Sequence, residues 1–279
     1  MGRGRRTLLA LVVAAAMLSG PLAESAAASH SWSSYHWART TSEFDLQVGD
    51  NVSGPWEVTL DRAVADWSTS GIIDLVEVPG TTSGRRCRPS AGRVEVCNAK
   101  YGANGWLGLA QIWLDGNGHI TQGLAKMNDT YFNLSTYDDP VKRSQVLCQE
   151  IGHTLGLDHQ DESGADLNTC MDYAAQLDNP SPNSHDYAQL ESIYAHLDGY
   201  NSYTDEVPSG DGGGGKGGGK GGGKGGGNGG GKPADAGSNW GQSVASAQGG
   251  HGEFFVRDLG NGELLVTHVI WVDGYNSSA

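Results

Sequence analysis

The sequence has little positive charge and few long apolar segments, and both observations limit the functions that the protein can have. Lysine and arginine together number 18 against 32 aspartates and glutamates, which leaves a formal net charge of −14. This balance argues against a nucleic-acid partner, because binding phosphates requires a basic face. Beyond the first residues, no apolar segment approaches the ~20 residues that a membrane-spanning helix needs. We therefore expect no membrane attachment once the N-terminal segment is removed.

That N-terminal segment has the pattern of a secretory signal peptide. A basic start precedes an apolar run from Leu8 to Leu18, and small residues follow as far as Ala28. The run is too short for a transmembrane anchor. We therefore predict a signal peptide over residues 1–28 and a secreted, extracellular protein.

A glycine-rich stretch divides the rest of the chain. Residues 209–237 are built largely from a GGGK repeat. Such sequence buries too little surface to offset the entropy of ordering, so we predict a flexible linker. A collagen helix is excluded, because glycine does not recur at every third position. The expected organisation is a body over residues 29–208, the linker, and a small tail over residues 238–279.

The body alternates strand and helix patterns, which predicts an α/β (α+β) fold. Period-two apolar spacing marks the strands, and apolar spacing of three and four residues marks the helices. Asp139 and Pro140 are the cap and first-turn residues of the helix that carries most of the polar motif described below. In chain order the expected elements are a strand at 44–49, a helix at 55–71, a strand at 72–78, a hairpin at 108–128, and helices at 139–156 and 184–198.

The tail contains two alternating apolar runs around Asn261 and Gly262, which is the pattern of a β-hairpin. A lone hairpin is marginally stable in water. The hairpin therefore either docks on the body or acts as a separate, weak binding module, and its role stays open.

The chain has only four cysteines, and none of them is spaced as C-x-x-C, which argues against a cysteine zinc site. An even number of cysteines in an exported chain favours disulfides over free thiols. Four cysteines permit three pairings. We favour Cys87–Cys97, which closes a short basic loop, together with Cys148–Cys170.

The stretch CQEIGHTLGLDHQ, residues 148–160, carries metal-site spacing. Gln149 and His153 lie one helical turn apart, about 6 Å along the axis, and point the same way. Gly156 lets the chain leave the helix, so that His159 can return to the same ion. Three protein ligands leave a fourth position for water, as in catalytic rather than structural zinc sites. Glu150 is placed to take a proton from that water.

This stretch resembles the metzincin clan of zinc endopeptidases, whose motif is H-E-x-x-H-x-x-G-x-x-H followed by a turn containing methionine. Glu150, His153, Gly156 and His159 match the motif, whereas Gln149 stands where the clan has its first histidine. The order of the predicted elements is similar to the matrixin-like branch, and the resemblance implies a metzincin-like domain with a twisted mixed sheet, an active-site helix, a Met-turn and a C-terminal helix. The resemblance covers residues 37–197 and leaves out the linker and the tail.

The resemblance implies roles for residues outside the motif. The stretch NTCMDY would form the turn, with Met171 as the floor beneath the metal and Tyr173 as a catalytic residue that faces it. A Cys148–Cys170 disulfide would tie this floor to the ligand helix, and the helix from Ser184 would be the clan's C-terminal helix. The implied activity is that of a zinc-dependent metalloendopeptidase, a monomer that cleaves proteins or peptides.

Glutamine at position 149 leaves three alternatives open. Its amide oxygen is a neutral donor and a poorer zinc ligand than imidazole. Gln149 could coordinate zinc through this oxygen, or it could hold a water or orient Glu150 while the two histidines, with or without Tyr173, keep the metal. In the third alternative, the chain is a pseudoprotease that acts as a secreted binding or inhibitory protein.

Two further features allow a purely structural interpretation as well as a functional one. The acidic residues Asp161, Glu162 and Asp166 could hold a calcium ion, although a solvated acidic loop is the simpler interpretation. The remaining histidines lack the spacing of metal ligands, and we expect each of them on the surface or in packing. They are His30, His36, His119, His185, His196, His251 and His268.

Overall fold

The fold is that of a computed structural model, which describes residues 30–161, 163–173, 176–204, 239–246 and 251–275. The predicted signal peptide and linker lie outside the described residues. Within the described part of the chain, no helix is long and apolar enough to cross a membrane.

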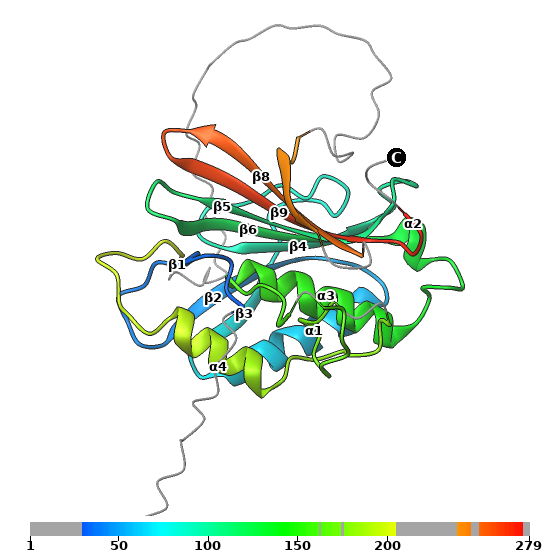
Figure 1. The fold of residues 1–279 in the computed structure, drawn as a ribbon, viewed down its shortest axis with the longest axis horizontal. Coiled ribbons are helices and arrows are strands. Elements are labelled where there is room, and N and C mark those ends of the chain that lie inside the picture. Colours follow the sequence, from blue (N-terminus) through cyan, green and yellow to red (C-terminus); the bar gives the residue numbers. More distant parts are fainter. Residues whose placement is uncertain (1–29, 162, 174–175, 205–238, 247–250, 276–279) are drawn as a thin grey trace, which may run out of the picture.

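One twisted, mixed nine-stranded sheet runs through the molecule (Figure 1). Its order is β3-β2-β4-β6-β5-β9-β8-β7, and β1 pairs with β6 beside this path. Pairing is parallel among β1, β2, β3, β4 and β6 and antiparallel from β6 onward. The strands are β1 (His36–Trp37), β2 (Phe44–Asn51), β3 (Ile73–Pro79), β4 (Val94–Ala99), β5 (Trp106–Leu114), β6 (His119–Asn128), β7 (Gln242–Ser246), β8 (Gly252–Gly260) and β9 (Glu263–Trp271).

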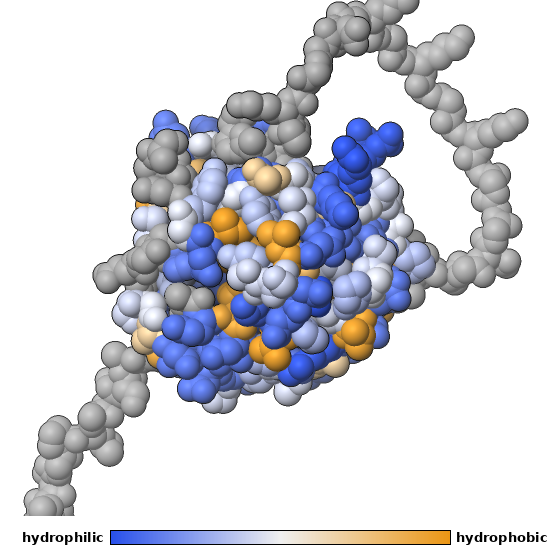
Figure 2. Space-filling model, turned by 90° about the vertical axis from the view of Figure 1, so that its right-hand side faces the viewer, coloured by the Kyte–Doolittle hydropathy of each residue, from blue (hydrophilic) through white to orange (hydrophobic). Residues whose placement is uncertain are grey.

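The longer helices gather on one side of this sheet (Figure 1). They are α1 (Trp56–Trp67), α3 (Pro140–Thr154) and α4 (Ser184–Ile193), with a short α2 (Asp129–Phe132) and a 3₁₀ turn at Ser68–Ser70. The α/β class with a mixed sheet is confirmed. Figure 2 shows that the face turned to the viewer is mostly hydrophilic, with separated apolar patches.

Helix α3 begins and ends where the sequence predicts. The side chain of Asp139 accepts hydrogen bonds from the backbone N–H groups of Val141 and Lys142, which satisfies two donors of the first turn. At the other end, Gly156 adopts a φ of 96°, and a Cβ atom there would collide with the carbonyl oxygen of Tyr35. Only glycine suits this turn, because the conformation and the space both exclude a side chain.

Two buried tryptophans fix α3 from both sides. The indole N–H of Trp67 in α1 donates to the carbonyl of Cys148 at 3.0 Å, and that of Trp37 in β1 donates to Thr154 at 2.9 Å. Both indoles have no exposed surface. Helix α3 is therefore held along its length, which gives its polar side chains fixed positions.

The predicted tail hairpin forms, and it docks on the body. Strands β8 and β9 pair around Asn261 and Gly262, and β9 pairs antiparallel with β5. Figure 1 shows this hairpin beside β5 at the end of the sheet. Val266 and Ile270 of β9 join the main core, and Val269 and Trp271 join a second cluster on the opposite face. The tail thus contributes to the core of the body rather than standing apart.

Both favoured disulfides are present. Cys87 bonds to Cys97, and Cys148 bonds to Cys170, with no free cysteine among the described residues. The second bond joins α3 to the turn that contains Met171. Sequence patterns had not predicted β1, β4, β7 or α2. Strand β4 is buried on both faces and so lacks alternation, and β1 is only 2 residues long.

Candidate metal centre

Three polar residues of the motif, all on helix α3, lie in the interior of the protein. Glu150 and His153 have no exposed surface, and Gln149 is 5% exposed. Burying a carboxylic acid and an imidazole without need is costly, so such groups mark a site. Their surroundings decide what they can do.

Gln149 ties α3 to the turn that contains Met171. Its amide nitrogen donates to the carbonyl oxygen of Cys170 at 2.7 Å and to that of Asp172 at 2.9 Å. Met171 itself is fully buried, and its sulfur lies against Gly152 of α3. Both amide hydrogens of Gln149 are therefore donated to carbonyl groups of the turn.

Three imidazoles come together in this interior, and one of them comes from the tail. The ligand nitrogens of His153, His159 and His268 all lie within 4.8 Å of one another. Ring centroids are 4.7 Å apart for His153 and His159, 4.1 Å for His153 and His268, and 4.9 Å for His159 and His268. His268 is fully buried, which agrees with a packing role, but it also lies beside the two motif histidines. Its spacing in the sequence does not indicate this, because the residue reaches the motif through sheet pairing.

Backbone pairing and a glycine bring His268 to α3. In the β5–β9 ladder His268 is the partner of Ala110. Two residues earlier, Gly108 leaves room for α3 to approach the sheet, since a Cβ atom there would lie 2.5 Å from Val146 and 3.1 Å from Oε1 of Glu150. The helix therefore lies close enough for Glu150 to reach across β5, and its Oε2 is 3.2 Å from Nδ1 of His268.

Four ring nitrogens of the cluster have no hydrogen-bond partner among the described residues. Nδ1 of His153 lies 2.9 Å from the carbonyl oxygen of Leu157, which can only accept, so this nitrogen carries the proton. Nδ1 of His268 is engaged by Glu150. The unpartnered atoms are the buried Nε2 atoms of His153, His159 and His268 and Nδ1 of His159. Buried polar atoms are rarely left so, and this arrangement fits a metal bound by three imidazoles.

Electrostatics favours the ligand form of these rings. Burial lowers the pKa of His153, His159 and His268 well below the ordinary value, and the neighbouring rings lower it further for His153 and His268. The rings are thus neutral, which is the form that binds metals. Burial also raises the pKa of Glu150 well above its ordinary value.

Aromatic rings close the cluster. Trp32 stacks on His153 with centroids 4.9 Å apart, and Tyr173 stacks on His159 at 3.5 Å. Phe254 of β8 lies against all three imidazoles, with centroids 4.8 to 5.7 Å away. The resulting shell is apolar, and it strengthens any charge interaction inside it.

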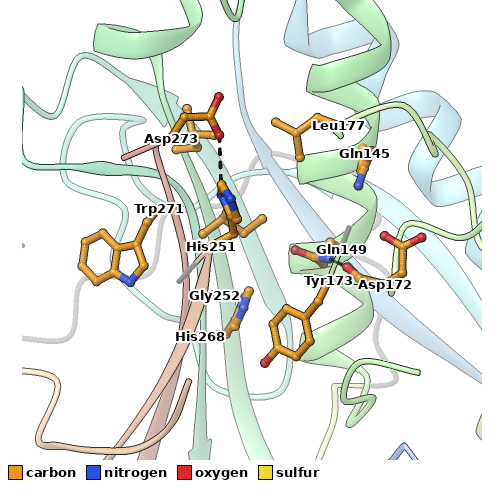
Figure 3. Close-up of a pocket in the computed structure, with 12 residues that line it drawn as sticks. Gln145, Gln149, Asp172, Tyr173, Leu177, His251, Gly252, His268, Trp271 and Asp273 are labelled. Atoms are coloured by element: carbon orange, nitrogen blue, oxygen red, sulfur yellow. Dashed lines mark hydrogen bonds and ion pairs between the residues drawn. The ribbon is translucent and has the colours of Figure 1, made fainter. Parts of the chain in front are cut away.

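A small pocket, with a cavity volume of about 20 Å³, lies beside the cluster. Figure 3 shows its two walls, one formed by α3 with Gln145 and Gln149, the other by the strands that carry Trp271 and His268. Tyr173 and His268 line the pocket, whereas Glu150 and His153 are not among its lining residues. The pocket therefore borders the cluster at these two rings.

The acidic loop considered for calcium uses its carboxylates within the protein. Asp161 accepts hydrogen bonds from Ser163, and Asp166 accepts from Asn168 and Asn179. Glu162 lies outside the described residues. The described part of the loop gives no support for a calcium site.

The residue that sequence reasoning missed, His268, did carry a signal. It shares the parity of Val266 and Ile270 in β9, and those residues join the core that faces the helices. A histidine on the buried face of an apolar strand needs a partner. That signal indicates a buried polar role, but the partner depends on the pairing of β9 with β5.

Comparison with known proteins finds structural similarity alone. Myroilysin shares 14% identity and a TM-score of 0.35, with 57% of this chain and 96% of that chain covered. High choriolytic enzyme 1, a hatching-enzyme zinc protease from the medaka Oryzias latipes, shares 12% identity and a TM-score of 0.34, with 57% and 94% covered. The sequence matches no protein-family model and no curated protein. Similarity at this level does not identify the family of this chain.

Proposed function

We propose that the chain is a secreted zinc-dependent metalloendopeptidase whose metal is held by His153, His159 and His268. One observation carries this proposal: beside the buried carboxyl group of Glu150, three buried imidazoles bring ligand nitrogens within 4.8 Å of one another, and their Nε2 atoms have no hydrogen-bond partner among the described residues. In this proposal His268 takes the place that the motif gives to position 149, and Gln149 supports the turn instead.

The donor set favours zinc among the metals. Three neutral imidazoles suit zinc, whereas calcium and magnesium take oxygen ligands. Three protein ligands leave a further position for water, which is typical of catalytic sites. When bound there, zinc would lower the pKa of a water molecule and polarise the carbonyl group of the scissile bond.

Glu150 has two oxygens and a separate task for each. Oε2 accepts a hydrogen bond from Nδ1 of His268, which orients the ring and leaves its Nε2 available as a ligand. Oε1 has no hydrogen-bond partner among the residues that the structure describes. In the proposed reaction Oε1 takes the proton of the attacking water, and the acid so formed gives it to the leaving amine.

Peptide access runs through the pocket described above. Its wall contains Tyr173 and His268, so a peptide carbonyl reaches the cluster when the Tyr173 ring leaves its stack on His159. The displaced hydroxyl would then donate a hydrogen bond to the oxyanion that forms. Glu150 stays buried behind this wall and is protected from bulk water until a substrate enters.

The setting of the site supports an exported enzyme of the metzincin clan. The N-terminal sequence has the signal-peptide pattern, and both disulfides form. Four motif positions, the turn at Met171 and Tyr173 match the clan's signature. The proposed substrates are proteins or peptides.

The burial of Glu150 favours one alternative, a metal-binding protein without catalysis. Glu150 has no exposed surface, and aromatic rings close the cluster on several sides. A pseudoprotease that holds zinc in this form would bind partners without cutting them.

Zinc content and peptide cleavage of the purified mature protein separate these outcomes. Wild type should bind zinc and cleave a peptide library, and Glu150→Gln should keep the zinc and lose cleavage. His268→Ala should lose one equivalent of zinc relative to wild type, whereas His251→Ala, a change at another tail histidine outside the cluster, should not. Zinc binding without cleavage would support the alternative, and unchanged zinc content in His268→Ala would contradict the proposed centre.

A further inference from the structure

A second group of histidines meets one aspartate away from the metal centre. His36 lies in β1, His119 is the first residue of β6, and His196 and Asp198 follow α4. None of these residues belongs to the cluster around Glu150. The group joins three segments that are far apart in the sequence, and the proposed peptidase activity makes no use of it.

The backbone places this group with little freedom. In the parallel pairing of β1 with β6, His36 and His119 are direct partners. Asp198 is fixed from the other side: its N–H donates to the carbonyl of Arg39 at 2.7 Å, and its Oδ2 accepts from the N–H of Arg39 at 2.9 Å. The side chains thus converge on a site that the main chain has already built.

The ring nitrogens converge on the carboxylate. Nε2 of His36 lies 3.2 Å from Nε2 of His196 and 3.5 Å from Oδ2 of Asp198. Nε2 of His196 is 3.7 Å from Oδ1 of Asp198, and Nε2 of His119 is 3.3 Å from the same oxygen. Ligands of a tetrahedral zinc ion with bonds of 2.0–2.1 Å are about 3.3–3.4 Å apart, which is close to these separations.

The hydrogen bond made by Nδ1 of His36 bears on whether its other ring nitrogen, Nε2, can act as a metal ligand. Nδ1 lies 2.7 Å from the carbonyl oxygen of Ser34, so it carries a proton, and in the neutral form of the ring Nε2 presents a lone pair. In that form the lone pair lies next to the nitrogen of His196 and the carboxylate of Asp198. Acceptors placed so close together require a cation between them or a further proton on one of the rings.

We infer that His36, His196 and Asp198 bind a zinc ion that serves the structure of the protein, separate from the centre at His153. Two imidazoles and a carboxylate form a donor set typical of zinc. The side chains of His36 and Asp198 are each 9% exposed, and that of His196 is 56% exposed, so the ion enters from solvent on the side of His196.

His119 is a positioning residue in this site. Its Nε2 contacts Oδ1 of Asp198, and its Nδ1 lies 2.8 Å from the hydroxyl of Tyr200, which in turn bonds to Asp115. The ring thereby holds the carboxylate toward His36 and His196. Contacts of this kind usually change metal affinity by about 10–100-fold.

The ion would fasten the segment after α4 to the strand beside the ligand helix. The neighbour of His36, Trp37, donates to Thr154 at the end of α3, and the carbonyl of Tyr35 borders Gly156. Zinc at this place therefore stabilises the turn that leads to His159. Its expected effect is on stability rather than on the chemistry of cleavage.

Zinc stoichiometry of the full mature chain tests the inference. Wild type should bind two ions, and His196→Ala and Asp198→Asn should each bind one. The first variant removes an exposed ring, and the second keeps an oxygen that accepts from Arg39, so both should fold. His268→Ala should also bind one ion, and the double variant with His196→Ala should bind none. His119→Gln should weaken the second equivalent by about 10–100-fold.

Each outcome has one meaning. A wild type that binds one ion, with His196→Ala unchanged, would overturn the second site and would mean that protonated imidazoles pair with Asp198 instead. Stability should rise with added zinc in His268→Ala, which keeps only this site, and should not do so in the double variant. A chain that loses zinc on His196→Ala but not on His268→Ala would keep this inference and overturn the proposed peptidase centre.

Discussion

Nδ1 of His268 lies 3.2 Å from Oε2 of Glu150, although the two residues belong to a C-terminal strand and to the motif helix. Both side chains are fully buried. The carboxyl group orients the imidazole, and the imidazole completes the cluster that the motif helix leaves short of one histidine. The tail is therefore part of the proposed metal centre, and the glutamine in the motif does not by itself remove that centre.

The first prediction concerns the tail as a docked element. A protease site introduced within residues 209–237 and then cut should leave the two pieces associated, because β9 pairs along β5 and buries apolar side chains on both faces. The cut protein should elute as one species and keep its full zinc content. Release of the pieces requires denaturant.

A chain truncated after residue 208 is the matched comparison for the cut protein. It lacks His268, so it should lose one equivalent of zinc and all peptide cleavage. Separation of the cut pieces in native buffer, with zinc remaining on the larger one, would show that the tail is dispensable for the centre.

The second prediction concerns Gln149. Gln149→His restores the clan motif but removes the two hydrogen bonds to the carbonyls of Cys170 and Asp172. Leaving buried acceptors unpaired should lower the free energy of unfolding by about 1–3 kcal/mol. Gln149→Glu, which has the same shape without the donor, should cost a similar amount. Chemical denaturation measures both.

Zinc binding by the same variants gives an independent test of this assignment. If Gln149 only supports the turn, Gln149→His should not tighten zinc binding at the centre. A variant that is as stable as wild type and binds zinc more tightly would show that position 149 is a ligand position after all.

Local chemistry accounts for what the sequence predicts well. The Asp139 cap, the Gly156 turn and the helical spacing between them act over a few residues, and α3 forms as these features indicate. The two alternating runs of the tail likewise predict the hairpin of β8 and β9. Each of these features is encoded by neighbours in the chain, so sequence patterns reveal it.

The ligand set could not be predicted in the same way. His268 meets His153 because β9 pairs with β5 and because Gly108 lets α3 lie close to that strand. Neither event leaves a spacing pattern around His268. The group at Asp198 is similar, since His36 and His119 become neighbours through the β1–β6 register. Long-range pairing decides both sites.

The third prediction concerns Gly156. Gly156→Ala places a methyl group against the carbonyl oxygen of Tyr35 in a backbone with φ of 96°. The conformation alone costs about 1–2 kcal/mol, and the collision adds to this. Because the turn places His159, zinc affinity at the centre should also fall.

Gly102→Ala is the matched control for Gly156→Ala, because it measures the backbone cost without a collision. Gly102 has a φ of 102°, and a Cβ atom there would meet nothing within 4 Å. This variant should lose only the conformational part of the stability and should keep its zinc. Equal stability losses and equal zinc contents in the two variants would contradict the assigned role of the turn.

The last prediction compares the two disulfides. Cys148–Cys170 closes a separation of 22 residues, and Cys87–Cys97 closes one of 10 residues. In the chain-entropy description each bond contributes about 3 kcal/mol, and the longer loop contributes about 0.7 kcal/mol more. Paired cysteine-to-alanine variants, measured by denaturant unfolding, should follow this order.

The variants should differ more clearly in zinc binding, because only Cys148–Cys170 joins the ligand helix to the turn that Gln149 contacts. Its removal should weaken zinc at the centre, whereas removal of Cys87–Cys97 should leave zinc content unchanged. The same zinc affinity in both variants would show that the hydrogen bonds of Gln149 hold the turn without the disulfide.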